Sequence, residues 1–198
     1  PSVGFGLFIS SLGLLPVIYA KYFGLALTTI ATVMLVARLF DAVTDPLIAH
    51  YSDLYRRKHG TRKPFVLVGG LGCMASAYFL CVPLGDITIT YFVFWYFVYY
   101  LFQTIYSIPM SAWAIEVTND PEGRTFLFSA RVFISQVGSL LFFLVPFLPF
   151  FSSTDYTPET IKVVVMLGII LMLPALLIAL RYAPNGAQLT QGLNTNTH

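Results

Sequence analysis

Five stretches of this 198-residue sequence run for 18 residues or more without an Asp, Glu, Lys or Arg. An α-helix needs about 20 mostly apolar residues to cross the roughly 30 Å of hydrocarbon in a bilayer. Only 10% of the residues are charged, whereas a soluble domain usually carries about a quarter. The sequence therefore predicts a protein that crosses a membrane several times. The uncharged stretches are residues 1–20, 64–85, 87–115, 132–154 and 163–180.

A sixth apolar stretch lies at about residues 25–50, where three charged side chains interrupt it. The sequence thus predicts an all-α membrane protein with six transmembrane helices within residues 1–182. The expected helices cover approximately residues 2–20, 25–50, 64–85, 87–113, 130–152 and 161–181. A tight hairpin is expected around Gly85 and Asp86, which separate the third and fourth helices. Residues 183–198 are polar, lack apolar periodicity, and predict a cytoplasmic linker or tail.

Basic residues are distributed unevenly between the two ends of the expected bundle. The loops at 51–63 and 117–131, together with the segment after residue 180, hold eight of them, and the opposite side holds two. The first set is Arg56, Arg57, Lys58, Arg62, Lys63, Arg124, Arg131 and Arg181, and the second is Lys21 and Lys162. Cytoplasmic loops carry the excess of Lys and Arg. The sequence therefore predicts that both termini are cytoplasmic, in a plasma or inner membrane.

Ionisable residues in the second expected helix are the main functional signal. Asp41 and Asp45 are four residues apart, so their carboxylates lie on one helix face, and Arg38 precedes Asp41 by three. Charges at bilayer depth cost about 2.5–3.5 kcal/mol on insertion scales and usually mark an ion or solute path. Two adjacent carboxylates there would share a proton or hold a cation such as sodium. Thr44 adds a neutral oxygen, and Pro46 leaves one backbone carbonyl without its helical donor.

Two other interpretations of these charges stay open from the sequence. In the first, Arg38 and the two acids form a buried ion-pair cluster that fixes helix packing. In the second, the helix is shallow and the acids lie near the cytoplasmic surface, because Asp45 closely precedes the basic loop.

The fourth expected helix carries polar residues that could face the two acids. Thr104 and Ser107 are three residues apart on one helix face, and their hydroxyls could bind a hard cation or hydrogen-bond a sugar. They are candidate cation ligands. Gln103, Tyr106 and Trp113 are candidate solute contacts. Hydroxyl side chains can also simply join neighbouring membrane helices.

Arg131 opens the fifth expected helix and is followed by an uncharged run. It is a candidate solute contact, a salt-bridge partner for Glu116, or a positive charge on the cytoplasmic side. The sequence does not indicate an enzyme, because it has no nucleophile–base pair, no His or Cys cluster with metal-ligand spacing and no Gly-rich phosphate loop. No cofactor is expected beyond a coupling ion, sodium or proton. The net charge of +2 gives no reason to expect nucleic acid as a partner.

Two segments of the sequence resemble a known transporter family. The string ARLFDAVTDPLIAHYSDLYRRKHGTRKP at 37–64 resembles the second helix and following loop of the glycoside–pentoside–hexuronide:cation symporters, the melibiose-permease-like branch of the major facilitator superfamily. The string IPMSAWAIEVTNDPEGRTFLFSARVF at 108–133 resembles the fourth helix, loop and fifth-helix start of that family, and YFGLAL at 22–27 gives a weaker match. The resemblance implies the amino-terminal half of a major facilitator superfamily fold.

The resemblance also implies roles for particular residues. Asp41 and Asp45 match the two cation-binding carboxylates of the family, Thr44 and Thr104 match neutral ligands, and Arg131 matches an arginine of the sugar site. A loop motif that latches the two halves of the transporter in one conformation is matched by Asp53, Gly60, Arg62 and Lys63.

The sequence departs from the melibiose permease pattern at acidic positions. Ser107 stands where that permease has a further Asp, and the first expected helix has no acidic residue. Galactoside specificity is therefore not expected. The preferred interpretation is cation-coupled symport of a sugar or sugar-like solute. The alternatives are a carrier of lipids or amphipathic solutes and a non-transporting six-helix membrane scaffold. The expected partners are the bilayer, a small-molecule solute, and a carboxy-terminal six-helix half or a second copy of the chain.

Overall fold

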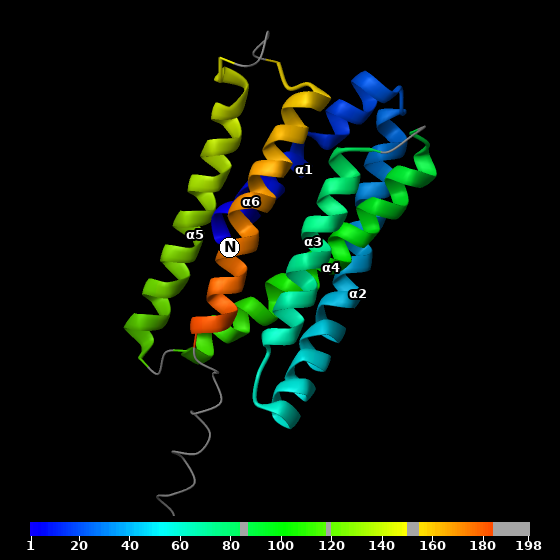
Figure 1. Ribbon diagram of the computed structural model, residues 1–198. Helices are drawn as coiled ribbons and strands as arrows, with labels where there is room; N and C mark the ends of the chain where they lie inside the picture. Colours follow the sequence, from blue (N-terminus) through cyan, green and yellow to red (C-terminus); the bar gives the residue numbers. More distant parts are fainter. Residues whose placement is uncertain (84–86, 118–119, 150–154, 184–198) are drawn as a thin grey trace, which may run out of the picture.

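The computed structural model describes residues 1–83, 87–117, 120–149 and 155–183, and within them the chain is helical, with no strand. The six-helix all-α prediction is confirmed (Figure 1). The helices are α1 (Ser2–Phe23), α2 (Leu27–His59), α3 (Lys63–Cys81), α4 (Ile89–Val117), α5 (Pro121–Leu144) with the short 3-10 turn η1 (Val145–Phe147), and α6 (Pro158–Tyr182). The hairpin expected around residues 85–86 and the tail at 184–198 lie outside the described residues.

Five of the six helices are long and apolar enough to cross a membrane: α1, α2, α3, α5 with its 3-10 turn, and α6. The remaining helix, α4, has 29 residues and is rich in Tyr and Trp. The polar groups of these side chains lower its mean hydropathy. It packs against α3 and α2, and Figure 1 shows it running beside them through the bundle.

Two helices extend further than their uncharged stretches predicted. α2 runs past the expected end at residue 50 to His59, so most of the expected loop at 51–63 is helical. Basic side chains in its last turn suit the negative end of the helix dipole, and Gly60 closes the helix with φ 72°. α5 begins at Pro121 instead of 130, where the Asp120 side chain accepts a hydrogen bond from the backbone N–H of Gly123 at 3.1 Å.

The first three helices and the last three helices make equivalent contacts. α1 packs against α5 and α6, α4 packs against α2 and α3, and α3 meets α6. Replacing α1, α2 and α3 by α4, α5 and α6 reproduces this pattern of contacts. Three-helix repeats of this kind occur in each half of major facilitator transporters. The repeat is visible in the packing although the sequence does not display it.

Glycines allow the closest helix contacts of the bundle. α1 crosses α5 so tightly that a Cβ at Gly6 would overlap the carbonyl group of Ser135, and one at Gly138 would overlap the carbonyl group of Val3. Small residues at such crossings let membrane helices approach one another and gain van der Waals contact. Helices α1 and α5 therefore approach each other closely at these two glycines.

The outer helices α2 and α5 leave most of their surface uncovered. Of their described residues, only Ile30, Ala37 and Ser52 of α2 and Gly138 and Phe142 of α5 are buried. Both helices expose large apolar side chains along the rest of their length. These surfaces are suited to lipid or to a further group of helices.

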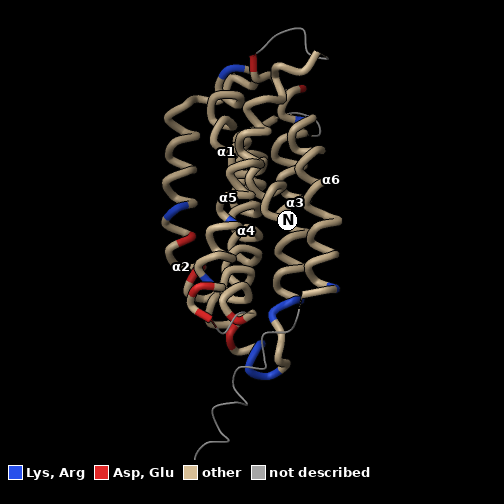
Figure 2. The backbone as a smooth tube through the Cα atoms, turned by 90° about the vertical axis from the view of Figure 1, so that its left-hand side faces the viewer, with Lys and Arg blue, Asp and Glu red and all other residues tan. Residues whose placement is uncertain are grey.

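Charged residues gather at one end of the bundle (Figure 2). The ends of α2, α4 and α6 and the start of α5 lie together at this end, as the distribution of basic residues predicted. Assignment of this end to the cytoplasm stays a prediction.

Candidate functional site

The two carboxylates of α2 lie near the middle of a 33-residue helix. Asp45 is followed by fourteen further helical residues up to His59, which at 1.5 Å per residue is about 21 Å of helix. From the sequence, a shallow position is one of two open alternatives, because Asp45 closely precedes the basic loop. The length of α2 does not decide between the deep and the shallow position, because the helix continues through basic residues that would lie in water. The depth of the pair stays a prediction.

The Asp41 side chain is mostly buried, but only one of its two carboxylate oxygens lies near a partner group. Its Oδ2 atom lies 4.0 Å from Nη1 of Arg38, and the two side chains are 15% and 71% exposed. Its Oδ1 atom is buried and has no hydrogen-bond partner in the described structure. Arg38 also lies 5.3 Å from the centre of the Tyr100 ring. A largely exposed guanidinium at the limit of ion-pair distance does not lock the acids into a closed cluster.

Four polar residues form one stripe along α4: Tyr100, Thr104, Ser107 and Ser111. Their spacing of four, three and four residues places them on one helix face, about 16 Å from end to end. Tyr100 and Thr104 are buried, and the two serines are partly buried. We call this row the polar stripe. Arg38 of α2 lies at its Tyr100 end.

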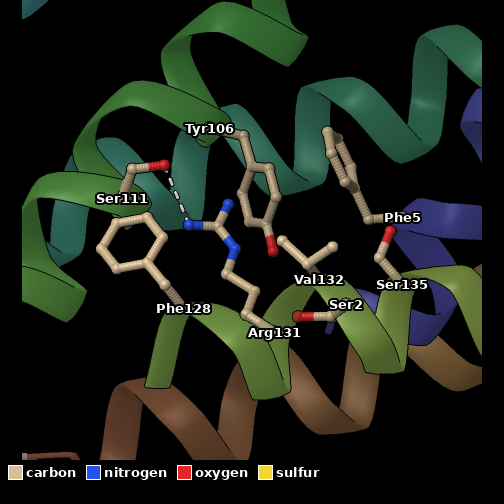
Figure 3. Close-up of a pocket in the computed structure, with 8 residues that line it drawn as sticks. All are labelled: Ser2, Phe5, Tyr106, Ser111, Phe128, Arg131, Val132 and Ser135. Atoms are coloured by element: carbon tan, nitrogen blue, oxygen red, sulfur yellow. Dashed lines mark hydrogen bonds between the residues drawn. The ribbon is translucent and has the colours of Figure 1, made fainter. Parts of the chain in front are cut away.

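Arg131 of α5 lies at the other end of the polar stripe. Its Nη1 donates a hydrogen bond to Oγ of Ser111 at 2.9 Å (Figure 3). The side chain points into a pocket of about 240 Å³ between α1, α4 and α5. The pocket is lined by Ser2, Phe5, Tyr106, Ser111, Phe128, Arg131, Val132 and Ser135.

The predicted salt bridge between Arg131 and Glu116 is wrong. Arg56 and Arg62 bind Glu116 instead, with N–O distances of 3.0 and 3.1 Å. Among the described residues Arg131 forms no ion pair, so its hydrogen bond to Ser111 leaves its positive charge uncompensated. The solute-contact interpretation of Arg131 is the one that the pocket favours.

An ionic network joins α2, α3 and α4 at the charged end of the bundle. Arg62 is only 5% exposed. Its Nε donates to Oε1 of Glu116 at 3.1 Å, its Nη1 donates to Oγ of Ser52 at 2.7 Å, and its Nη2 pairs with Asp53. We call these residues, with Arg56, the Arg62 network. All three nitrogens of the guanidinium contact protein groups, so Arg62 holds the ends of these helices together.

The predicted latch residues gather around this network. Asp53 and Arg62 are part of it, Gly60 ends α2, and Nζ of Lys63 lies 5.7 Å from the centre of the Trp113 ring. Trp113 therefore lies at the charged end, not in the pocket.

Gln103 does not line the pocket either, whereas Tyr106 does. Of the four predicted solute contacts, the pocket thus brings together Tyr106 and Arg131. Within the described residues no hydrogen bond links the α2 acids to Thr104 or Ser107. The roles of all these residues stay predictions.

Sequence reasoning missed the parts that Ser52, Arg56 and Glu116 take in the Arg62 network. Glu116 is 54 residues from Arg62 along the chain. A signal was present, because Glu116 is an acid at the end of an otherwise apolar helix, opposite a basic loop.

The bundle thus combines apolar helices long enough to cross a membrane with two acids near the middle of α2 and an arginine beside a partly open pocket. Charged residues within membrane helices usually mark an ion or solute path, which is typical of membrane transport proteins. The family described as "MFS/sugar transport protein" matches residues 1–193. The chain belongs to this family. It is therefore a multi-pass integral membrane protein of a transport family and not an enzyme.

Curated relatives of the chain are symporters. It is 35% identical over 131 residues to the "Putative glycoside/cation symporter YagG" of Escherichia coli, which is 64% of this chain and 28% of that protein. It is 31% identical over 131 residues to the "Inner membrane symporter YicJ" of Escherichia coli, covering 62% of this chain and 27% of that protein. It is 26% identical over 160 residues to the "Uncharacterized symporter YnaJ" of Bacillus subtilis, covering 78% and 34%.

These names confirm the resemblance to the glycoside–pentoside–hexuronide:cation branch of the major facilitator superfamily. The chain spans about a third or less of the length of these curated relatives.

Proposed function

We propose that this chain forms the amino-terminal half of a transporter that couples the uptake of a glycoside-like solute to entry of sodium or protons. The observation that carries the proposal is the Asp41–Asp45 pair, one turn apart near the middle of α2, in which the buried Oδ1 atom of Asp41 has no hydrogen-bond partner among the described residues. A carboxylate oxygen that lacks a hydrogen-bond donor or an ion-pair partner at bilayer depth would be stabilised by a proton or by a bound cation. Both ligands are coupling ions.

Coupling between cation and solute binding would follow from the way both proposed sites adjoin α4. The acids of α2 are next to Arg38, which lies at the Tyr100 end of the polar stripe, and Arg131 of α5 lies at the Ser111 end. A cation at the Asp41–Asp45 pair would draw the Tyr100 end of the polar stripe and α2 together. A solute at Arg131 would do the same for the Ser111 end and α5. If each ligand stabilises the same packing of α2, α4 and α5, each raises the affinity for the other by the same factor.

The partner of this half is a second group of six helices, either a carboxy-terminal half or a second copy of the chain. The uncovered surfaces of α2 and α5 support this part of the proposal, because both are too little buried to complete a bundle by themselves. The Arg62 network would hold the charged end of this half rigid while the two halves rock about the solute. Both termini would then be cytoplasmic, as the basic residues at that end favour.

The proposal is tested by solute uptake into membrane vesicles that carry the full-length protein containing these residues. An inward sodium or pH gradient should drive accumulation of a labelled glycoside. Asp45→Asn removes one carboxylate charge while keeping the side-chain size, and it should abolish gradient-driven accumulation. The matched control is Glu159→Gln, which neutralises an exposed carboxylate in the first turn of α6 and should transport normally. Unchanged accumulation by Asp45→Asn would remove the coupling role of the pair.

A further inference from the structure

Arg38 lies between an acid of its own helix and an aromatic ring of α4. Its Nη1 atom is 4.0 Å from Oδ2 of Asp41, and its guanidinium carbon is 5.3 Å from the centre of the Tyr100 ring. A closed pair of guanidinium and carboxylate has N–O distances of about 2.7–2.9 Å, so this ion pair is open. A cation within about 6 Å of an aromatic ring centre is attracted by the ring face. The guanidinium is therefore shared between the acid and the ring.

The ring is the fixed partner in this contact. Tyr100 is 7% exposed, and its hydroxyl accepts a hydrogen bond at 3.1 Å from the hydroxyl of Tyr96, which is 1% exposed. The Tyr100 ring also packs against the rings of Tyr96 and Tyr99, with centres 4.8 and 5.9 Å apart. The side chain of Arg38, in contrast, is 71% exposed. The buried ring therefore positions the arginine, and the arginine does not position the ring.

The position of Arg38 decides how accessible Asp41 is to another cation. A guanidinium in contact with a carboxylate satisfies both oxygens through two parallel hydrogen bonds. In that closed arrangement Arg38 would compete directly with a coupling ion for Asp41. At 4.0 Å the competition is weaker, and the buried Oδ1 atom of Asp41 has no hydrogen-bond partner among the described residues. The attraction of Arg38 to the ring thus keeps the acid available.

We propose that Tyr100 is a positioning residue for the cation site, which acts through Arg38. The face of its ring holds the guanidinium away from a closed ion pair with Asp41 and thereby raises the affinity of the acid pair for the coupling ion. This inference rests on the proposed function and adds a residue of α4 that sets the ion affinity of the same site.

The test measures sodium binding as thermal stabilisation of the purified full-length protein in detergent, at constant pH. Asp41→Asn should remove the stabilisation, which assigns the signal to the acid pair. Tyr100→Leu removes the ring, and the half-saturating sodium concentration should rise about two- to fivefold, the range expected for one exposed cation–π contact. Tyr100→Phe keeps the ring face and should restore a value close to that of wild type.

Fluorinated forms of the Tyr100→Phe variant test the ring face without removing buried volume. Each fluorine withdraws electron density from the ring face and weakens its attraction for a cation, while the size of the ring changes little. With one, two and three fluorines on the ring, the half-saturating sodium concentration should rise step by step. A role in packing alone would not produce this series, because all of its members fill the same space.

A second set of variants shows whether the effect passes through Arg38. In an Arg38→Met background the competing charge is absent, so Tyr100→Leu and the fluorinated forms should leave the half-saturating sodium concentration unchanged. The control for loss of a buried ring is Phe142→Leu in α5, a residue that is 0% exposed and stacks on Tyr156. It should lower the Tm but leave the half-saturating sodium concentration at the wild-type value.

If the coupling ion is a proton, sodium has no effect and the same variants are titrated with acid. The groups that titrate beside Asp41 are Asp45 of α2 and Tyr96 and Tyr100 of α4, whereas α1, which also contacts α2, has no acidic residue. Weaker binding of the proton to the acid pair in Tyr100→Leu should move the midpoint of stabilisation to lower pH by about 0.3–0.7 units.

An ion affinity that is the same for every fluorinated form overturns the inference. So does a dependence on fluorine that persists in the Arg38→Met background, or tighter ion binding when the ring is removed. In each of these cases the wild-type protein still binds the coupling ion, and cation-coupled symport stands. If neither sodium nor acid stabilises the wild-type protein through Asp41, the proposed function itself fails.

Discussion

Replacing Arg62 with methionine should destabilise the charged end of the bundle more than any nearby charge removal. The methionine side chain fills much of the same volume but removes the hydrogen bonds that Arg62 donates to Ser52 and Glu116. Removing one partner of a buried ion pair costs about 3–5 kcal/mol. The lower end applies here, because Glu116 keeps Arg56 at 3.0 Å and the side chain of Asp53 is 54% exposed.

A loss of about 3 kcal/mol corresponds to a fall in Tm of about 6–12 °C for a domain of this size. The assay is thermal unfolding of the purified full-length protein in detergent. The matched control is Arg57→Met in the last turns of α2, where the arginine is exposed and forms no ion pair among the described residues. That variant should melt within about 2 °C of wild type, since exposed charges contribute little.

Equal melting temperatures for the two variants would show that the Arg62 network does not hold the helix ends together. Arg62→Lys gives a second check, because a lysine keeps the charge but cannot reach Ser52, Asp53 and Glu116 at once. It should fall between wild type and Arg62→Met. A lysine variant as stable as wild type would assign the effect to charge alone.

Two further predictions concern packing within the membrane. Gly138→Leu should separate α1 from α5 and lower the Tm by several degrees, because its side chain would overlap the backbone of α1; a wild-type Tm would show that the helices do not cross this closely. Cys73 and Cys81 are buried, so a maleimide should label them only after denaturation; rapid labelling of the native protein would contradict the packing of α3.

The number and order of the helices could be predicted because hydrocarbon thickness imposes a minimum length on every apolar segment. Their ends could not be predicted in the same way. Beyond the hydrocarbon a helix is in water, where charges are no obstacle, so α2 continues through its basic residues until Gly60 stops it. α5 begins at the Asp120 cap for a local reason that a search for uncharged stretches does not detect.

The candidate site was predictable where it depends on one helix and unpredictable where it joins several. The spacing of Asp41 and Asp45 determines that both lie on one face of α2, whatever the remaining helices do. The same holds for Thr104 and Ser107 on α4. In contrast, the choice of Ser111 over Glu116 as the partner of Arg131 depends on how α4 and α5 cross, which one sequence does not contain.

Arg62 and Arg131 show how a structural arginine differs from one that could bind a ligand. Arg62 is almost fully buried and uses every guanidinium nitrogen on protein partners, so a ligand there would have to replace contacts already made. Arg131 is half-buried, holds one serine, and faces a pocket. The pocket beside Arg131 is partly open, so its guanidinium can be solvated by water or contacted by a bound group. If a carboxylate of the partner helices bound Arg131, this residue would be a second structural joint, and Arg131→Gln would lower the Tm of the full-length protein. If Arg131 contacts the solute, Arg131→Gln lowers solute uptake and leaves the Tm close to that of wild type.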